Sequence, residues 1–164
     1  MAKYFTIEEM CISASYPKLV VVPQKGTIIY NNWERLMGEL DKVRETYGKP
    51  IIVTSGYRPP LLNAKVGGSA TSMHRYGLAA DVKSKSSQKD NVNILRTAIE
   101  SDIPYDQLIA EKATFKGGVL ESMQWLHVGL SQGKARRQLL YFDGKGYYPL
   151  KMVKNSDGEI TFKK

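Results

Sequence analysis

The sequence has very few of the residues that build disulfides and thiolate metal sites. Its 164 residues include one cysteine, Cys11, and two histidines. A single cysteine excludes an intramolecular disulfide and any zinc site made of several thiolates. We interpret Cys11 as a buried, unreactive thiol.

Long apolar runs are missing as well. No segment approaches the roughly 20 apolar residues that cross a bilayer, so no membrane-spanning helix is expected. The residues Met1 to Phe5 do not open an apolar run of signal-peptide length. Classical export is therefore not expected, and the protein should be made in the cytoplasm.

Positive charge, in contrast, is abundant. The chain has 24 lysines and arginines against 16 aspartates and glutamates, which gives a formal net charge of +8. Such a charge attracts polyanions, for example nucleic acid or an anionic bacterial cell wall. The basic residues are spread along the chain, with only short pairs such as Arg136-Arg137 and Lys163-Lys164. Dispersed charge is typical of a solvated surface, so a nucleic-acid partner is not expected.

The hydrophobic pattern predicts helices early in the chain. Thr6 and Glu9 match a capping box, which predicts the start of a short helix. An amphipathic helix is predicted to follow Asn31-Asn32 and to end at Gly48 to Pro50. Its apolar stripe consists of Trp33, Leu36, Met37, Leu40 and Val43. A later helix is predicted over 92–99, with a cap near Asp90 or Asn91.

Strands are predicted between and after these helices. The segments 51–54, 78–82, 107–109 and 125–130 have strand character. Turn residues at Asp143 to Gly146 and at Asn155 to Gly158 predict two hairpins near the C-terminus. We therefore predict an α+β fold in which helices pack on an antiparallel sheet. Residues 1–164 would form one domain, with the β-hairpins of 138–164 as an appendage.

Both histidines lie in segments that suit a metal ion. Asp81 follows His74 by seven residues, with small residues between them, and His127 lies in the alternating segment 125–130. A catalytic zinc ion takes three protein ligands and leaves its fourth position to water. We predict one Zn²⁺ ion bound by His74, Asp81 and His127. Each residue alone is more typical of an ordinary structural position, so the prediction depends on their joint occurrence.

Hydrolysis at such a site needs a general base that is not a metal ligand. Glu111 closes the segment that begins at Tyr105, and Glu121 lies six residues before His127. If the strands around Glu111 and His127 pair, Glu111 lies beside the metal. Along one extended strand, Glu121 would lie about 20 Å from His127. We favour Glu111 and keep Glu121 as the alternative.

A reaction that develops negative charge also needs a fixed cation. Arg58 follows Tyr57 and precedes Pro59-Pro60, which should hold it rigidly. Its planar guanidinium suits a carboxylate or an oxyanion. Trp125 is predicted to belong to the core, behind the strand that presents His127.

The candidate residues belong to longer strings whose order is distinctive. The strings are Ser55-Gly56-Tyr57-Arg58, Asn63, Val66-Gly67-Gly68-Ser69, Ser72-x-His74-x-x-Gly77-x-Ala79-x-Asp81, Asp106-Gln107-Leu108-Ile109-x-Glu111 and Trp125-x-His127-Val128. Together they resemble the zinc D-Ala-D-Ala carboxypeptidase family of peptidases. This family includes phage peptidoglycan endopeptidases and vancomycin-resistance dipeptidases, and it shares its fold with the hedgehog signalling domain. The resemblance extends from about Tyr4 to Arg137.

The resemblance implies roles for individual residues. Zinc would be bound by the three residues named above, Arg58 would contact substrate or the oxyanion, and Ser72 would touch substrate. Several members of the family carry the catalytic acid three residues before the last histidine, where this sequence has Gln124. Another branch uses the glutamate that corresponds to Glu111. In shorter relatives that glutamate lies six residues before the histidine, as Glu121 does here, so both glutamates remain open.

The function that follows is hydrolysis of peptide bonds in bacterial peptidoglycan stem peptides, as a D-Ala-D-Ala carboxypeptidase or as an endopeptidase of the endolysin type. We expect a monomer that reaches the wall after phage-type release, or a cytoplasmic dipeptidase. The alternative is a catalytically inactive, zinc-containing module that binds the cell wall. A closed structural zinc site would need a fourth protein ligand, and the sequence has no third histidine and no second cysteine.

Overall fold

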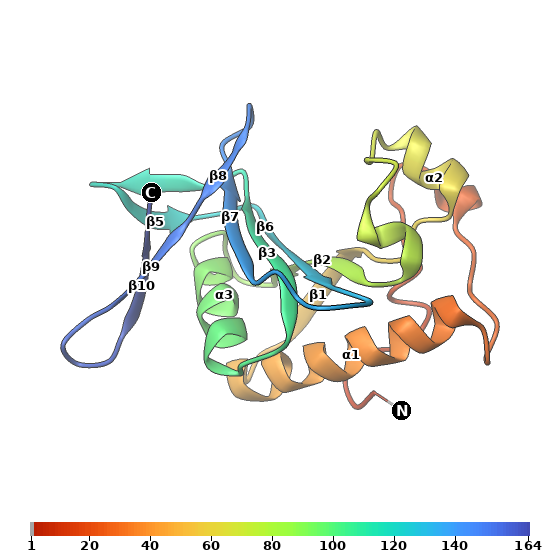
Figure 1. Cartoon of the computed structure of the whole chain (residues 1–164), viewed down its shortest axis with the longest axis horizontal. Coiled ribbons are helices and arrows are strands. Elements are labelled where there is room, and N and C mark those ends of the chain that lie inside the picture. Colours follow the sequence, from red (N-terminus) through yellow and green to blue (C-terminus); the bar gives the residue numbers. More distant parts are fainter. Residues whose placement is uncertain (1) are drawn as a thin grey trace.

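Three α-helices and two β-sheets organise residues 2–164, the part of the chain that the computed structural model describes (Figure 1). The helices are α1 (Ile28–Tyr47), α2 (Pro60–Lys65) and α3 (Asp90–Glu100), with 3-10 turns η1 (Pro17–Leu19) and η2 (Met73–Tyr76). The strands are β1 (Ile51–Ser55), β2 (Ala79–Ser84), β3 (Tyr105–Glu111), β4 (Thr114–Lys116), β5 (Val119–Ser122), β6 (Trp125–Leu130), β7 (Gln138–Phe142), β8 (Tyr147–Pro149), β9 (Lys151–Lys154) and β10 (Ile160–Lys163). No helix in 2–164 is long and apolar enough to cross a membrane.

The strands form a larger and a smaller sheet. The larger sheet has the order β1-β2-β6-β3-β7-β8, and the smaller one has the order β4-β5-β10-β9. The α+β class is confirmed, but the prediction of an antiparallel sheet is wrong at one pair, because β3 and β7 are parallel. The cause is topological. Since β6 runs antiparallel to β3 and already occupies one of its edges, a strand that follows β6 and joins the free edge of β3 runs parallel to β3.

Helix α1 is the predicted amphipathic helix, but it begins earlier in the sequence than predicted, before Asn31-Asn32. Its five buried residues are the five predicted ones. The helix begins at Ile28 because Thr27 caps it, accepting a hydrogen bond from the backbone N–H of Tyr30 at 3.3 Å. Gly48 ends it in the left-handed conformation at φ 77°, as is common at helix C-termini.

The capping box at Thr6 is formed, but the predicted helix is not. The N–H of Thr6 donates to a Glu9 carboxylate oxygen at 2.7 Å, and the N–H of Glu9 donates to Thr6 Oγ1 at 3.2 Å. The backbone that follows makes only a turn. Cys11 is buried there, and burial raises the pKa of its thiol to about 12, as expected for an unreactive cysteine.

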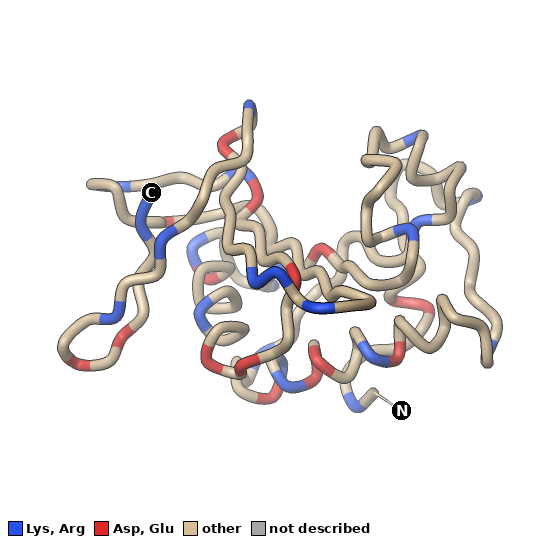
Figure 2. The backbone as a smooth tube through the Cα atoms, in the orientation of Figure 1, with Lys and Arg blue, Asp and Glu red and all other residues tan. Residues whose placement is uncertain are grey.

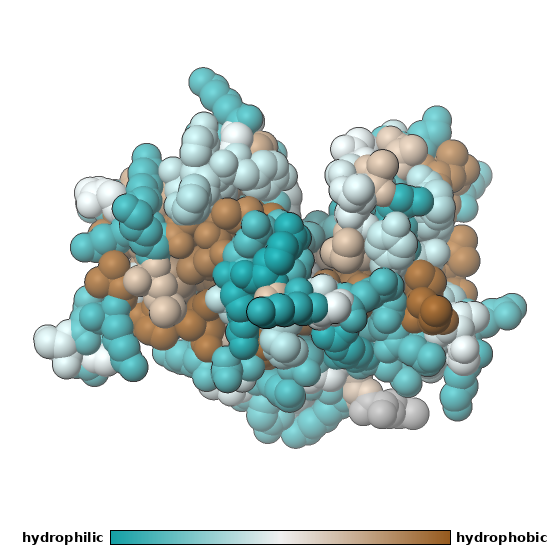
Figure 3. Space-filling view, in the orientation of Figure 1, coloured by the Kyte–Doolittle hydropathy of each residue, from teal (hydrophilic) through white to brown (hydrophobic). Residues whose placement is uncertain are grey.

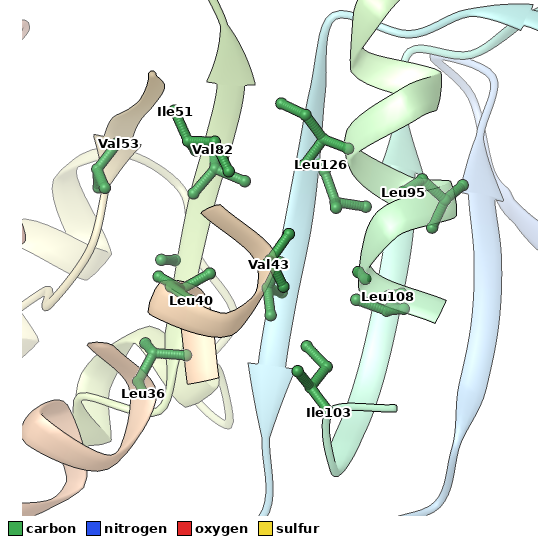
Figure 4. Close-up of a cluster of buried hydrophobic side chains, with 14 of the residues drawn as sticks. Leu36, Leu40, Val43, Ile51, Val53, Val82, Leu95, Ile103, Leu108 and Leu126 are labelled. Atoms are coloured by element: carbon green, nitrogen blue, oxygen red, sulfur yellow. The ribbon is translucent and has the colours of Figure 1, made fainter. Parts of the chain in front are cut away.

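The core lies between the larger sheet and the two long helices, α1 and α3 (Figure 4). Because side chains alternate along a strand, one face of each central strand points toward the helices. Val82, Leu108 and Leu126 belong to that buried face. Their neighbours Asp81 and His127 therefore lie on the opposite face, where the candidate site is found.

The two predicted C-terminal hairpins, β7–β8 and β9–β10, are confirmed as antiparallel pairs. They are built into both sheets, since β7 pairs with β3 and β10 pairs with β5. The buried residues of 138–164, which join the main hydrophobic cluster, are Tyr141, Leu150, Ile160 and Phe162. The division into a single peptidase domain with 138–164 as an appendage stays a prediction.

Lysine and arginine residues occur on helices, strands and loops along the whole chain (Figure 2). The predicted dispersion of basic charge is therefore seen in the fold.

Candidate metal centre

The predicted site residues meet in one cleft of about 870 Å³ on the face of the larger sheet that is turned away from α1 and α3. Its lining includes Arg58, Ser72, His74, Asp81, Glu111, Trp125 and His127. In the space-filling view the cleft is the notch between the β7–β8 hairpin and the lobe that carries α2 and η2 (Figure 3). The site thus lies between the larger sheet and a lobe of short turns.

Two of the candidate ligands come from neighbouring strands. Asp81 on β2 pairs directly with His127 on β6. Residues that pair directly across a sheet present their side chains on the same face. His127 Nδ1 lies 3.0 Å from Asp81 Oδ1 as a result.

The third candidate ligand, His74, is brought in by the short turn η2. Ser72 caps this turn, because its Oγ accepts a hydrogen bond from the His74 N–H at 3.3 Å. Gly77 ends it in the left-handed conformation at φ 71°, and a Cβ there would lie 2.9 Å from the backbone oxygen of Ile29. The chain then enters β2, so His74 Nε2 lies 3.3 Å from Asp81 Oδ1.

A backbone carbonyl fixes the orientation of the His74 ring. His74 Nδ1 lies 2.7 Å from the oxygen of Gly56. A carbonyl only accepts hydrogen bonds, so Nδ1 carries the proton and Nε2 keeps a free lone pair. Nε2 is buried, and among residues 2–164 it has no hydrogen-bond partner. Gly56 itself is required by close packing, since a Cβ there would lie 2.0 Å from the Met10 oxygen.

The three side chains fit a zinc ion in geometry and in charge. Their ligand atoms all lie within 4.8 Å of one another, and tetrahedral bonds of about 2.0 Å place neighbouring ligand atoms about 3.3 Å apart. Burial lowers the pKa of His74, which favours the neutral imidazole. Burial alone would raise the pKa of Asp81, but His74 and His127 hold it well below its usual range. A neutral imidazole and an ionised carboxylate are the forms that bind metal.

Glu111 lies beside this group, as expected from the pairing of its strand. β3 and β6 are antiparallel neighbours, with Ile109 opposite His127 and Glu111 opposite Trp125. The Glu111 side chain is only 8% exposed. Burial raises the pKa of its carboxyl to about 7, with His127 and Lys112 acting against the rise.

Glu121 lies elsewhere. It belongs to β5 of the smaller sheet and forms an ion pair with Lys89 at 3.6 Å. Residues 112–120 form most of the β4–β5 hairpin, which leads the chain out of the larger sheet. Glu121 is not among the residues that line the cleft.

Arg58 is tied to the same centre through its backbone, since its N–H donates to the oxygen of His74 at 2.9 Å. Its side chain lines the cleft, and burial lowers its pKa while Asp81 acts in the opposite direction. Arg58 Nε is buried and has no hydrogen-bond partner within 2–164. This donor is thus shielded from solvent, although the side chain belongs to the cleft wall.

Sequence reasoning missed part of the cleft wall. Trp125 is not a core residue behind its strand: it lies on the same face as His127, two positions away, and lines the cleft. The alternation of segment 125–130 already contained that signal. Leu140, Phe142 and Tyr147 of the β7–β8 hairpin also line the cleft, and no local pattern in the sequence indicated it.

The buried Glu111 carboxyl makes the stability of the metal-free protein depend on pH. Its folded pKa of about 7 lies above the ordinary value of 4.5, so the folded state holds this proton more tightly than the unfolded chain does. Ionisation therefore costs stability as the pH rises from 4.5 through about 7. Glu111→Gln should raise the free energy of unfolding at about pH 9 by at most about 3 kcal/mol, and have little effect on it near pH 4.

Urea denaturation of the chelator-treated protein at both pH values measures this difference. Glu121→Gln is the matched control, because that glutamate pairs with Lys89 outside the cleft. The same change in stability at both pH values for Glu111→Gln would contradict the effect of burial.

Comparison with protein families identifies the group to which this chain is related. Residues 3–129 match the Peptidase M15 family, while a comparison with curated proteins returned no match. The match covers most of the chain and includes the His-Asp-His group, Arg58 and Glu111. The chain belongs to the Peptidase M15 family, whose members are zinc-dependent metallopeptidases.

Proposed function

We propose that this protein hydrolyses peptide bonds in bacterial peptidoglycan stem peptides, as a D-Ala-D-Ala carboxypeptidase or as an endopeptidase of the endolysin type. His74, Asp81 and His127 hold one zinc ion in this proposal, and Glu111 is the general base. The observation that carries it is the convergence of a His-Asp-His group and a buried glutamate in one open cleft.

Glu111 moves the proton in the proposed reaction. When bound, zinc supplies Lewis acidity, which makes water more acidic and polarises a carbonyl oxygen. The Glu111 carboxylate accepts the proton of the attacking water and then passes it to the nitrogen of the leaving amine. In the metal-free protein, burial raises the pKa of this carboxyl to about 7. A bound zinc cation would lower that pKa, which favours the carboxylate that accepts the proton at neutral pH.

Arg58 and Ser72 hold the substrate in this proposal. The planar guanidinium of Arg58 lines the cleft and suits the oxyanion or a substrate carboxylate. Because its backbone is hydrogen-bonded to His74, Arg58 keeps a fixed position relative to the metal ligands. Ser72 lines the cleft while its Oγ caps η2, so it combines a structural role with a place beside the substrate.

The open cleft favours a peptidase over a catalytically inactive, zinc-containing wall-binding module. A structural zinc site is closed by four protein ligands, whereas the described residues offer three ligand atoms facing a cleft of about 870 Å³. We retain a monomer and the packing of the hedgehog-type fold as part of the proposal.

Digestion of purified peptidoglycan tests the function. Muropeptides are incubated with the zinc-loaded protein and analysed by mass spectrometry, with and without 1,10-phenanthroline. We expect cleavage products whose masses identify the bond, loss of these products with the chelator, and their return when zinc is added back. A zinc-loaded protein that leaves every muropeptide intact would overturn the proposed substrate.

A further inference from the structure

The cleft face of the larger sheet carries its side chains in rows that cross several strands. One row contains His127 on β6, Ile109 on β3 and Leu140 on β7, which pair directly with one another in this order. In the next row Glu111 pairs with Trp125. One side of Glu111 is therefore covered by β6, and the other side faces β7.

Two aromatic residues of the β7–β8 hairpin lie on that other side. Tyr141 pairs with Ala110, which places the following residue, Phe142, next to Glu111 in the parallel register. Phe142 in turn pairs with Tyr147. The rings of Phe142 and Tyr147 lie 4.7 Å apart between centroids, and both line the cleft.

Tyr147 packs on Phe142 but stays largely exposed. Its side chain is 57% exposed, although it lies in the cleft wall beside a buried catalytic candidate. The next residue, Tyr148, points to the opposite face and packs on the buried Tyr141 at 5.4 Å between ring centroids. Tyr148 thus has a packing role, whereas the Tyr147 ring presents its surface to the cleft.

We propose that Leu140, Phe142 and Tyr147 form a subsite for the apolar side chain of the substrate residue on the leaving side of the scissile bond. This inference rests on the proposed function and deepens it by naming the kind of leaving residue. Because Glu111 passes its proton to the leaving nitrogen, the residue that carries this nitrogen lies next to Glu111 and therefore next to the β7–β8 hairpin.

The charges around the cleft agree with an apolar leaving residue. Arg136 lines the cleft, but its guanidinium is held by the buried Asp106, with contacts down to 2.7 Å, at the far end of β3 from Glu111. Lys112 lies over the ring of Trp125, 5.8 Å from its centroid, on the side of Glu111 away from the hairpin. Of the described residues that line the cleft, those from the hairpin are Leu140, Phe142 and Tyr147, and they include no cation. The remaining arginine of the lining, Arg58, belongs to the loop before α2.

The proposed subsite lies outside the part of the chain that matches the peptidase family. The family match ends at residue 129, and the hairpin begins at Gln138. The catalytic residues are thus placed by the family fold, and the wall that faces the leaving residue is added by the segment that follows it.

Peptide selectivity tests the inference. We propose synthetic stem peptides with alanine, leucine or glutamate on the leaving side of the bond identified in the muropeptide digest. For the wild type, kcat/KM should be higher for leucine than for alanine, and lower for glutamate than for alanine by about tenfold or more. Tyr147→Ala and Phe142→Ala should each lower the leucine-to-alanine ratio about tenfold, with unchanged zinc content.

Tyr148→Ala is the matched control, because it removes the same side chain from the neighbouring position on the other face. It should keep the wild-type ratio. The proposed subsite is overturned if the leucine-to-alanine ratio of kcat/KM is unchanged in both Tyr147→Ala and Phe142→Ala. It is also overturned if the wild type prefers the glutamate peptide.

Binding to the zinc-loaded Glu111→Gln protein gives a second measurement that needs no turnover. Calorimetry should show tighter binding of the leucine peptide than of the alanine peptide, and Tyr147→Ala should remove the difference. If the wild type hydrolyses none of the peptides, the proposed function fails. The leucine-to-alanine affinity ratio still tests the subsite separately. If this ratio is the same in the Glu111→Gln protein with and without Tyr147→Ala, the proposed subsite is overturned.

Discussion

Replacing His74 with alanine should remove stoichiometric zinc from the protein and, with it, all measurable peptide hydrolysis. His74 offers its free Nε2 to the same point as Asp81 and His127. Mutation of residues that only orient a metal ligand costs about 10- to 100-fold in metal affinity, so loss of a ligand should cost more. Metal analysis after extensive dialysis measures the zinc content directly.

Folding must be separated from metal binding in this variant, because the His74 side chain is almost completely buried. Circular dichroism and thermal unfolding of the metal-free proteins provide that control. Asp81→Asn is a second variant, since it keeps the shape of the side chain and removes only its charge. A His74→Ala protein that retains one zinc ion per chain would refute the ligand set.

Glu111→Gln should have the opposite combination of effects: zinc stays bound and turnover is lost. The amide keeps the size of the side chain but does not accept a proton. General acid–base catalysis typically contributes about 10²- to 10⁴-fold to the rate, so kcat should fall by a factor in this range. Steady-state kinetics at saturating peptide, with zinc content measured on the same sample, tests both parts.

Glu121→Gln is the matched control for this experiment, because it makes the same chemical change at the other glutamate that the sequence left open. It removes an ion pair with Lys89 outside the cleft, so activity should stay close to that of the wild type. The reverse result, with Glu111→Gln active and Glu121→Gln inactive, would move the base to Glu121.

The features that the sequence predicted well depend on short separations along the chain. The stripe of α1 is a local period, and its five buried residues were all identified. His74 and Asp81 are separated by one turn and the start of one strand. Their convergence with His127 depends on a long-range pairing, that of β2 with β6, which the sequence did not indicate and the structure shows.

The features that the sequence did not predict depend on which strands become neighbours. The hairpin signal that contains β7 is visible in the sequence, but nothing local indicates that β7 joins the free edge of β3 in parallel. The cleft wall formed by Phe142 and Tyr147 follows only from that pairing. The position of Glu121 likewise depended on whether residues 112–120 stay in the larger sheet or leave it.

The parallel pairing of β3 with β7 also matters for how the protein is produced. A recombinant fragment that stopped at residue 129, where the family match ends, would leave the backbone N–H and C=O groups of β3 without partners along one side. Such a bare edge recruits strands from other molecules and promotes aggregation. The intact chain ends this sheet with the three-residue strand β8, whose last residue, Pro149, has no N–H to donate.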